Sequence, residues 1–306
     1  MNFSLFVFKF IDYGFDLLQN YSRYKDITVI KDIPYDEKDN KSCSGDIYYI
    51  KQEERKYPVY VNIHGGGFIA GDKKHRRSFS SFMAEQGMFV FNINYGLCPK
   101  YPFPEFIEHS IKALNFLKSL EKEYNLDLDN IFVGGDSAGG YISSMLGAIQ
   151  SNDSLREKLN LSSLEVNIKG LIMVCGSYDM VTLLSDKAPF KVSAEIGEAV
   201  TGIQKKEIHG KKEGLNGYPY VTELYPETYI NDKFPISFIA HSDGDFLVPK
   251  HGEKFIGLLN GKGVKVYEHR AKRILDIHCY PIFRFNKSSK KCLKQLQSFL
   301  KENIAL

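Results

Sequence analysis

The amino-acid sequence predicts an α/β fold, in which a mostly parallel central sheet is covered by helices on both faces. Short apolar runs alternate with longer stretches of helical spacing, and this alternation is typical of a parallel sheet. Of the 306 residues 43% are apolar, enough for one large core. The chemically distinctive segments extend from His64 to His278, so no domain boundary can separate them. We therefore expect one domain over residues 1–306.

Each predicted element has its own pattern along the chain. The strands are short apolar runs rich in β-branched and aromatic residues, and the helices repeat apolar residues every three or four positions. Loops at the carboxyl ends of the strands are expected to carry the functional site. The predicted strands cover residues 27–33, 46–50, 59–63, 88–94, 130–133, 169–175, 236–240 and 264–268. The predicted helices cover residues 105–120, 137–149, 250–260 and 288–304.

The segment Gly135-Asp136-Ser137-Ala138-Gly139-Gly140 places a serine between a predicted strand and a predicted helix. This is the context in which Gly-x-Ser-x-Gly forms a nucleophile elbow. A serine held in such a strained turn brings the neighbouring backbone close to the strand and the helix, and a Cβ on either glycine would clash. Taken alone, the motif is also compatible with a glycine-rich turn that holds an idle serine.

A second motif, His64-Gly65-Gly66-Gly67-Phe68, follows the strand predicted at 59–63. Consecutive glycines leave backbone N–H groups unshielded and able to converge on one point, which a developing oxyanion requires. Alone, this segment is compatible with a flexible loop. Upstream of a Gly-Asp-Ser-Ala-Gly elbow it matches the oxyanion-hole motif of lipases and esterases, with His64 bracing the loop.

Together the two motifs resemble those of the α/β-hydrolase superfamily, specifically the hormone-sensitive-lipase-like family of bacterial carboxylesterases and acetyl esterases. Two further segments are similar to family segments, Asn94-Tyr95 with Tyr101-Pro102-Phe103-Pro104, and Tyr218-Pro219-Tyr220-Val221. Gly96-Leu97-Cys98 replaces the family's usual Arg-Leu-Ala, which removes a supporting arginine but no catalytic group. The resemblance covers most of the chain. It implies the α/β-hydrolase fold, and an oxyanion hole built from the backbone N–H groups of Gly66, Gly67 and Ala138.

The resemblance also implies a helical cap over the site, and two segments fit this role, residues 1–25 and 180–217. In the second, the strand pattern gives way to mixed helical and polar sequence, too long for an ordinary loop. The first has no basic n-region or cleavage site of a signal peptide and is shorter than the roughly 20 apolar residues of a membrane span. A membrane-surface helix is the alternative, but basic residues on its polar face are too few to favour it. Its apolar residues have the spacing of an amphipathic helix, namely Phe3, Phe6, Val7, Phe10, Gly14, Leu17 and Leu18.

A serine becomes an effective nucleophile when a histidine takes its proton and a carboxylate orients that histidine. The superfamily supplies these groups in the chain order serine, acid, histidine. His278 lies where the family's histidine falls, in a loop between the last predicted strand and the C-terminal helix. His241 and His269, which end strands, are the alternatives.

The acid is predicted from the segment after the strand at 236–240. Asp245-Phe246-Leu247 resembles the family's Asp-Pro-Leu segment, and this alignment selects Asp245. Asp243, two residues away, is the alternative if the loop is longer. Asp179 and Asp276 are further candidates, although aspartate is also common in turns and caps.

Composition and motifs argue against several other classes of protein. The net charge of +3 favours no polyanionic partner, and Lys73-Lys74-His75-Arg76-Arg77 is expected to be the solvated start of a helix, not a nucleic-acid patch. No metal-binding or nucleotide-binding motif is present, so we expect neither a metal nor a cofactor. Five widely spaced cysteines without a Cys-x-x-Cys pair are typical of free thiols in a reducing cytoplasm.

The sequence therefore predicts a cytoplasmic serine hydrolase that cleaves small, short-acyl carboxylic esters through Ser137, His278 and Asp245. Phe3, Phe6 and Phe10 of the N-terminal helix are expected to project over the acyl pocket. The partner is a small-molecule ester, with no nucleic acid and no stable membrane association; homo-oligomerisation is left open. An amide-cleaving relative such as an arylformamidase and a non-catalytic ligand receptor on the same fold are the alternatives. Because the sequence offers a candidate residue for every catalytic role, we favour an enzyme over a non-catalytic receptor.

Overall fold

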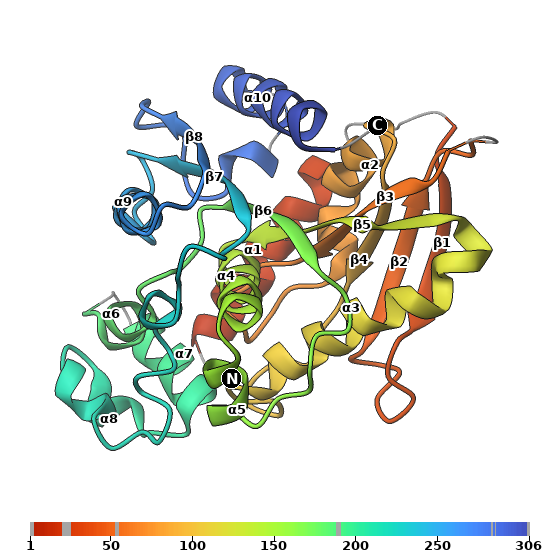
Figure 1. The fold of residues 1–306 in the computed structure, drawn as a ribbon. Helices are drawn as coiled ribbons and strands as arrows, with labels where there is room; N and C mark the ends of the chain where they lie inside the picture. The colour runs from red at the N-terminus through yellow and green to blue at the C-terminus, as the bar shows by residue number, and fades with distance from the viewer. Residues whose placement is uncertain are drawn as a thin grey trace.

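The strands form one sheet, in the order β1-β2-β4-β3-β5-β6-β7-β8 (Figure 1). The computed structural model describes residues 3–19, 26–52, 55–187, 191–282, 284 and 286–304. β1 pairs antiparallel with β2 and β2 with β4, and all other neighbours pair in parallel. The mostly parallel sheet predicted from the sequence is thus confirmed. The strands are β1 (Thr28–Pro34), β2 (Ser44–Tyr49), β3 (Tyr57–Ile63), β4 (Phe89–Ile93), β5 (Leu126–Asp136), β6 (Ile168–Val174), β7 (Ile236–Ser242) and β8 (Val266–Ala271).

The central strands are apolar because helices cover both faces of the sheet. Every residue of β3 and β4 is buried, as parallel strands between two helical layers require. All eight predicted strands occur, with ends shifted by a few residues. The largest shift is in β5, which begins at Leu126 instead of 130. Its first residues alternate leucine and aspartate, and its pairing with β3 is irregular between Pro58 and Val59.

Two layers of helices enclose two apolar clusters. In Figure 1, α2 and α10 lie above the sheet, and α3 and α4 lie below it. Residues of α2 and α10 belong to one buried cluster, and residues of α3, α4 and α9 belong to the other. The α-helices are α1 (Phe3–Gln19), α2 (Arg77–Glu85), α3 (Glu105–Tyr124), α4 (Ala138–Ser151), α5 (Asp153–Lys158), α6 (Met180–Ser185), α7 (Val192–Thr201), α8 (Lys205–Ile208), α9 (His251–Gly261) and α10 (Lys287–Asn303). Short 3-10 helices are η1 (Lys73–Arg76), η3 (Lys212–Leu215), η4 (Pro226–Thr228) and η5 (Tyr280–Ile282).

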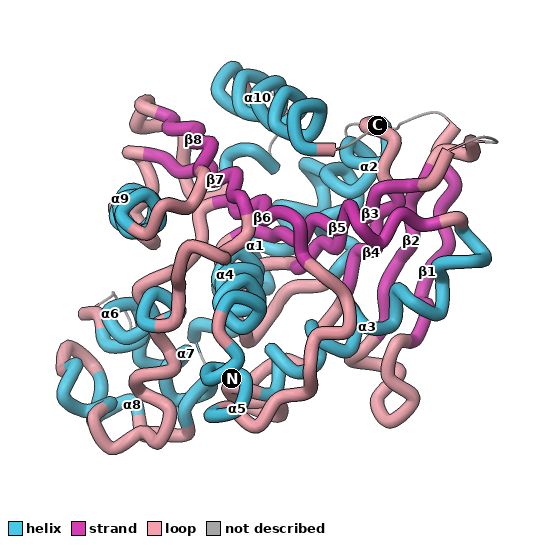
Figure 2. Tube along the Cα trace, in the orientation of Figure 1, coloured by secondary structure: helices cyan, strands magenta, loops and turns pink. Residues whose placement is uncertain are grey.

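The two segments expected to form a cap both contain helices. Figure 2 shows α6, α7 and α8 gathered below the sheet, with loops between them. The N-terminal segment forms α1, which lies against η1 and α7. Residues 1–2, 20–25 and 188–190 of the predicted cap, and the side chain of Leu18, lie outside the described residues. None of the described helices combines the length and the apolarity that a membrane span needs.

Candidate active site

Ser137 lies at a sharp turn between β5 and α4. Its backbone has φ 52° and ψ −115°, and its N–H donates to the Val174 carbonyl at 2.9 Å. A non-glycine residue at positive φ is strained and persists only where the surrounding structure holds it. A Cβ on Gly135 or on Gly139 would lie 2.0 Å from the Ile63 carbonyl oxygen. The two glycines thus allow the close approach that was expected of a nucleophile elbow.

His278 and Asp245 form a hydrogen-bonded pair, with Nδ1 of the histidine 2.7 Å from a carboxylate oxygen of the aspartate. The other oxygen of Asp245 accepts the N–H groups of Leu247 and Val248 at 3.0 and 3.1 Å. Burial alone would raise the Asp245 pKa, but the contact with His278 and the two N–H donors lower it below its ordinary value. A carboxylate held charged in this way can orient the histidine and stabilise its protonated form. Ser137 and His278 line the same cavity.

The other candidates for the acid and the base are engaged elsewhere. Asp243 is exposed, and one of its oxygens lies 2.7 Å from Nε of Arg270. The remaining candidates each contact another group, His241 with Glu268, His269 with Gln295, Asp179 with Thr182, and Asp276 with Ser288. Of the predicted acids and histidines, the structure therefore brings together Asp245 and His278 beside the cavity that Ser137 lines.

Gly66 and Gly67 line this cavity as well. They have φ values of 131° and 60°, which favour glycine. A Cβ on Gly66 would lie 2.2 Å from the Ala70 carbonyl oxygen, and one on Gly67 would lie 2.9 Å from the ring of Phe8. Ala138 begins α4 directly after Ser137, and its buried side chain is not part of the cavity wall. Only its backbone could contribute to an oxyanion hole, which is the role that the resemblance implies.

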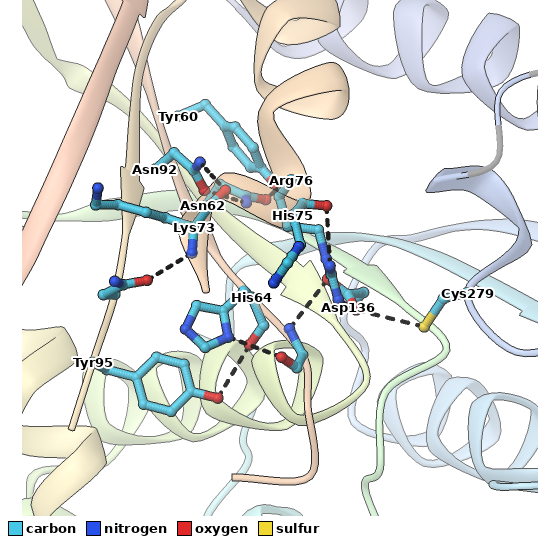
Figure 3. A network of polar contacts seen from close by, with 12 residues as sticks. Tyr60, Asn62, His64, Lys73, His75, Arg76, Asn92, Tyr95, Asp136 and Cys279 are labelled. Carbon is cyan, nitrogen blue, oxygen red and sulfur yellow. Dashed lines mark hydrogen bonds and ion pairs between the residues drawn. The ribbon is translucent and has the colours of Figure 1, made fainter. Parts of the chain in front are cut away.

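His64 braces the glycine loop. Its Nδ1 lies 2.8 Å from the Gly65 carbonyl oxygen, and its ring stacks on Tyr95 with ring centroids 4.5 Å apart. Burial lowers the pKa of His64 to about 4, so the ring is neutral near neutral pH. Figure 3 shows this histidine and Tyr95 beside the loop, where the tyrosine hydroxyl donates to the His64 carbonyl at 3.1 Å.

The expected solvated helix start at residues 73–77 is wrong, because Lys73, His75 and Arg76 are buried. Arg76 binds Asp136, the residue before Ser137, through Nε at 2.5 Å and Nη2 at 2.6 Å (Figure 3). Lys73 lies 2.6 Å from the buried carboxylate of Asp46. These cations are buried because buried carboxylates need partners. The sequence signal for this pair is Asp136 itself, a charged residue directly after the apolar run of a buried strand.

Asp136 also connects three segments of the site. Its carboxylate accepts the Gly65 N–H at 3.3 Å, and the Cys279 thiol next to His278 lies 3.6 Å from it. Burial would raise the Asp136 pKa, but the Arg76 guanidinium lowers it below its ordinary value. Burial raises the pKa of Cys279 well above its usual range, which favours the protonated thiol over the thiolate. The Arg76–Asp136 pair thus links η1, the turn at Ser137 and the glycine loop.

The position of Gly96, where the family has arginine, has no room for a side chain. A Cβ there would lie 2.4 Å from the Tyr101 ring and 2.5 Å from the His109 ring. The Gly96 N–H donates to Nδ1 of His109 at 3.0 Å. The supporting arginine of that segment is therefore absent from this chain, as the sequence indicated.

The cavity has a volume of about 590 Å³, and α1 forms part of its wall. Val7, Phe8 and Ile11 face it, together with Phe3. The expectation that Phe6 and Phe10 also project over the pocket is wrong, because these two side chains are 52% and 72% exposed. They lie one position before Val7 and Ile11, which turns them about 100° around the helix.

Polar contacts hold α1 in this position. The Ser4 N–H donates to Glu195 of α7 at 2.8 Å, and Asp12 accepts the Gly71 N–H at 3.1 Å. Asp16 lies 2.8 Å from a guanidinium nitrogen of Arg77. These contacts anchor α1 to α7 on one side and to the segment from Gly71 to Arg77 on the other.

Two groups of described residues have the composition of a metal site. One joins Cys175 to the Asp245–His278 pair, in which Nδ1 of the histidine already contacts the aspartate. The other contains His109, whose Nδ1 accepts the Gly96 N–H, so that a neutral ring carries its proton on Nε2 and has no free lone pair. In both groups, Nδ1 of the histidine is therefore already engaged in a hydrogen bond.

Comparisons with known proteins agree with this geometry. The BD-FAE family model matches residues 45–256, more than half of the chain. A curated relative, Probable carboxylic ester hydrolase LipM of Mycobacterium tuberculosis, is 28% identical over 193 residues, which are 63% of this chain and 42% of that protein. The chain spans less than half the length of the curated relatives it matches.

Solved structures share the fold. An inhibited Esterase B from Lactobacillus rhamnosis has a TM-score of 0.81 at 18% identity, covering 97% of this chain and 94% of that one. EstE1, a carboxylesterase cloned from a metagenomic library, has a TM-score of 0.74 at 17% identity, with 99% and 98% covered. At these identities the likeness shows the α/β-hydrolase fold.

Proposed function

Because this chain belongs to the BD-FAE family and has the α/β-hydrolase fold, we propose that it is a serine hydrolase of small, short-acyl carboxylic esters. The observation that carries the proposal is the His278–Asp245 pair, 2.7 Å apart, beside a cavity that Ser137, Gly66 and Gly67 also line. The names of relatives such as LipM and EstE1 support the same reaction class.

In the proposed mechanism, Ser137 Oγ attacks the acyl carbonyl carbon while Nε2 of His278 accepts the hydroxyl proton. Asp245 keeps the Nδ1–H tautomer and stabilises the imidazolium. The backbone N–H groups of Gly66, Gly67 and Ala138 stabilise the oxyanion, and His278 then protonates the leaving alcohol. A water molecule, deprotonated by the same histidine, releases the acid and restores Ser137.

We expect the cavity to favour short acyl chains because α1 and the glycine loop form part of its wall. Each added methylene contributes at most about 0.8 kcal/mol while it fits, and overfilling a packed site costs about 1–3 kcal/mol. The value of kcat/KM on p-nitrophenyl esters should therefore peak at roughly two to six acyl carbons and then fall. Matched anilides and formamides measure the preference for ester over amide.

A variant lacking residues 1–19 tests the part played by α1 in this preference. The dependence of kcat/KM on acyl-chain length should become flatter, and KM should rise more than kcat falls. The reason is that Ser137, Asp245 and His278 lie in segments that follow β5, β7 and β8, and not on α1. A peak at long acyl chains, or faster cleavage of the formamides, would contradict the proposed substrate class.

A further inference from the structure

Exposed apolar side chains concentrate on three segments that each contribute to the cavity wall. In the part of the chain that the structure describes, eleven large apolar side chains are exposed, and ten of them belong to three segments. The segments are α1 with Phe3, Phe6, Phe10, Tyr13 and Leu17, the loop after β7 with Phe246 and Leu247, and the loop before His278 with Ile274, Leu275 and Ile277. The eleventh, Val29, lies on the edge strand β1. Single exposed apolar residues are ordinary, whereas a cluster marks an interaction surface.

The three segments meet at the cavity. Phe3, Phe246 and Leu247 are exposed and also line the cavity. The loop after β7 lies against the loop before His278, since a Cβ on Gly244 would lie 2.5 Å from the Ile274 carbonyl oxygen. Apolar surface therefore continues from the cavity wall to the outside of the molecule. We call these ten exposed side chains the apolar rim.

Helix α1 has two apolar faces. Val7, Phe8 and Ile11 face the cavity, as the lining shows. Phe6, Phe10, Tyr13 and Leu17 repeat every three or four residues and form a second, exposed stripe. A helix that only covered the cavity would need one apolar face. The second, exposed stripe is therefore available to bind a surface outside the molecule.

Exposed cations accompany the apolar rim. Lys9 precedes Phe10 on α1, Lys272 and Arg273 precede Ile274, and Lys250 follows the loop after β7. The carboxylates on these segments have partners: Asp12 accepts the Gly71 N–H, Asp16 pairs with Arg77, and Asp243 pairs with Arg270. Apolar side chains flanked by basic ones are typical of segments that lie on an anionic lipid surface.

We propose that the apolar rim docks reversibly on an anionic lipid layer and admits esters from that layer to the cavity. A folded partner on this face would cover the mouth, whereas a lipid layer can itself contain the substrate. The proposed binding to lipid depends only on the surface described above, whereas the proposed delivery of esters rests on the proposed function. The charges of α1 alone did not favour a lipid surface. The structure adds two apolar loops and their three cations, which the helix by itself does not show.

Docking is tested without catalysis, by sedimentation of the Ser137→Ala protein with vesicles of equal parts phosphatidylcholine and phosphatidylglycerol. Adding Phe6→Ser/Phe10→Ser, or Ile274→Ser/Leu275→Ser, should lower the partition coefficient at least about tenfold, because each pair removes two large apolar contacts. Val29→Ser, which replaces an exposed apolar side chain outside the apolar rim, is the control and should leave the partition coefficient unchanged. Phosphatidylcholine alone, or high salt, should weaken binding of the parent protein.

Delivery is tested with the active protein. Both double variants should keep the wild-type rate on water-soluble p-nitrophenyl acetate and lose about tenfold on a short-acyl ester of an apolar alcohol dissolved in the vesicles. Equal vesicle binding by all variants would overturn docking, even if ester hydrolysis is found. A wild-type dimer that Phe6→Ser/Phe10→Ser converts to monomer would also overturn it, since the rim would then bind a second copy. Absence of soluble-ester hydrolysis with intact vesicle binding would instead refute the proposed function.

Discussion

Replacing Arg76 with methionine should destabilise the fold and the site together. Arg76 and Asp136 are 3% and 4% exposed, and two hydrogen bonds of 2.5 and 2.6 Å join them. Without the guanidinium, a fully buried carboxylate loses the partner that lowers its pKa. Removing one member of such a buried pair costs about 3–5 kcal/mol of unfolding free energy.

Urea unfolding followed by circular dichroism measures this cost. Lys118→Met is the matched control, because Lys118 and Glu165 form a pair of similar length, 2.8 Å, with both side chains about half exposed. That change should cost less than about 1 kcal/mol. Arg76→Lys keeps the charge and loses the two-pronged contact, so its stability should lie between wild type and Arg76→Met.

Activity distinguishes a positioning role from a purely structural one. Asp136 accepts the Gly65 N–H, so a displaced carboxylate also displaces the glycine loop. In the absence of urea, and at a temperature where the Arg76→Met protein is folded, its kcat should be roughly 100-fold lower than that of wild type, with a smaller change in KM. Arg76→Met/Asp136→Leu should recover part of the stability and none of the activity. An Arg76→Met protein within about 1 kcal/mol of wild type and with unchanged kcat would refute this reasoning.

Three further outcomes follow from the site. Asp245→Asn should lower kcat about 10⁴-fold and Asp243→Asn only slightly, and the reverse ranking in steady-state assays would reassign the acid. Gly66→Ala should lower activity and the yield of folded protein more than Gly67→Ala. A Cβ at Gly66 would lie 2.2 Å from a backbone oxygen, whereas a Cβ at Gly67 would lie 2.9 Å from an aromatic ring that can move. Equal losses in the two variants would contradict this. The folded-state pKa of Asp136 lies below 3.8, so its carboxylate stabilises the fold above that value and loses the effect as pH falls through the folded pKa. Urea titrations should therefore show the stability advantage of wild type over Asp136→Asn shrinking from about pH 5 to pH 3, and a pH-independent difference would contradict it.

Local patterns predicted the features that depend on local geometry. Apolar runs predicted the central strands most clearly, because strands buried between two helical layers must be apolar. Gly135 and Gly139 were expected to allow a close backbone approach, and both face the Ile63 carbonyl. The triad assignment to Ser137, Asp245 and His278 stays a prediction, although the last two are in hydrogen-bond contact.

Features that depend on distant partners were not visible in the sequence. The cluster at 73–77 was interpreted as solvated because its partner carboxylates, Asp46 and Asp136, lie 27 and 60 positions away in the chain. The face of α1 that meets the cavity was misplaced by one position, since Phe6 and Val7 are equally apolar and only packing selects between them. In the same way, one helix gave no hint of the two loops that complete the apolar rim.

The central claim is that Ser137 is the nucleophile. Diethyl p-nitrophenyl phosphate should transfer its diethylphosphoryl group to Ser137 Oγ and release one p-nitrophenol per chain as activity is lost, with the adduct located by peptide mass spectrometry. Ser137→Ala should release none and should lose at least about 10⁴-fold in kcat/KM on p-nitrophenyl acetate. An adduct on another residue, or a Ser137→Ala protein within about tenfold of wild-type activity, would contradict the claim.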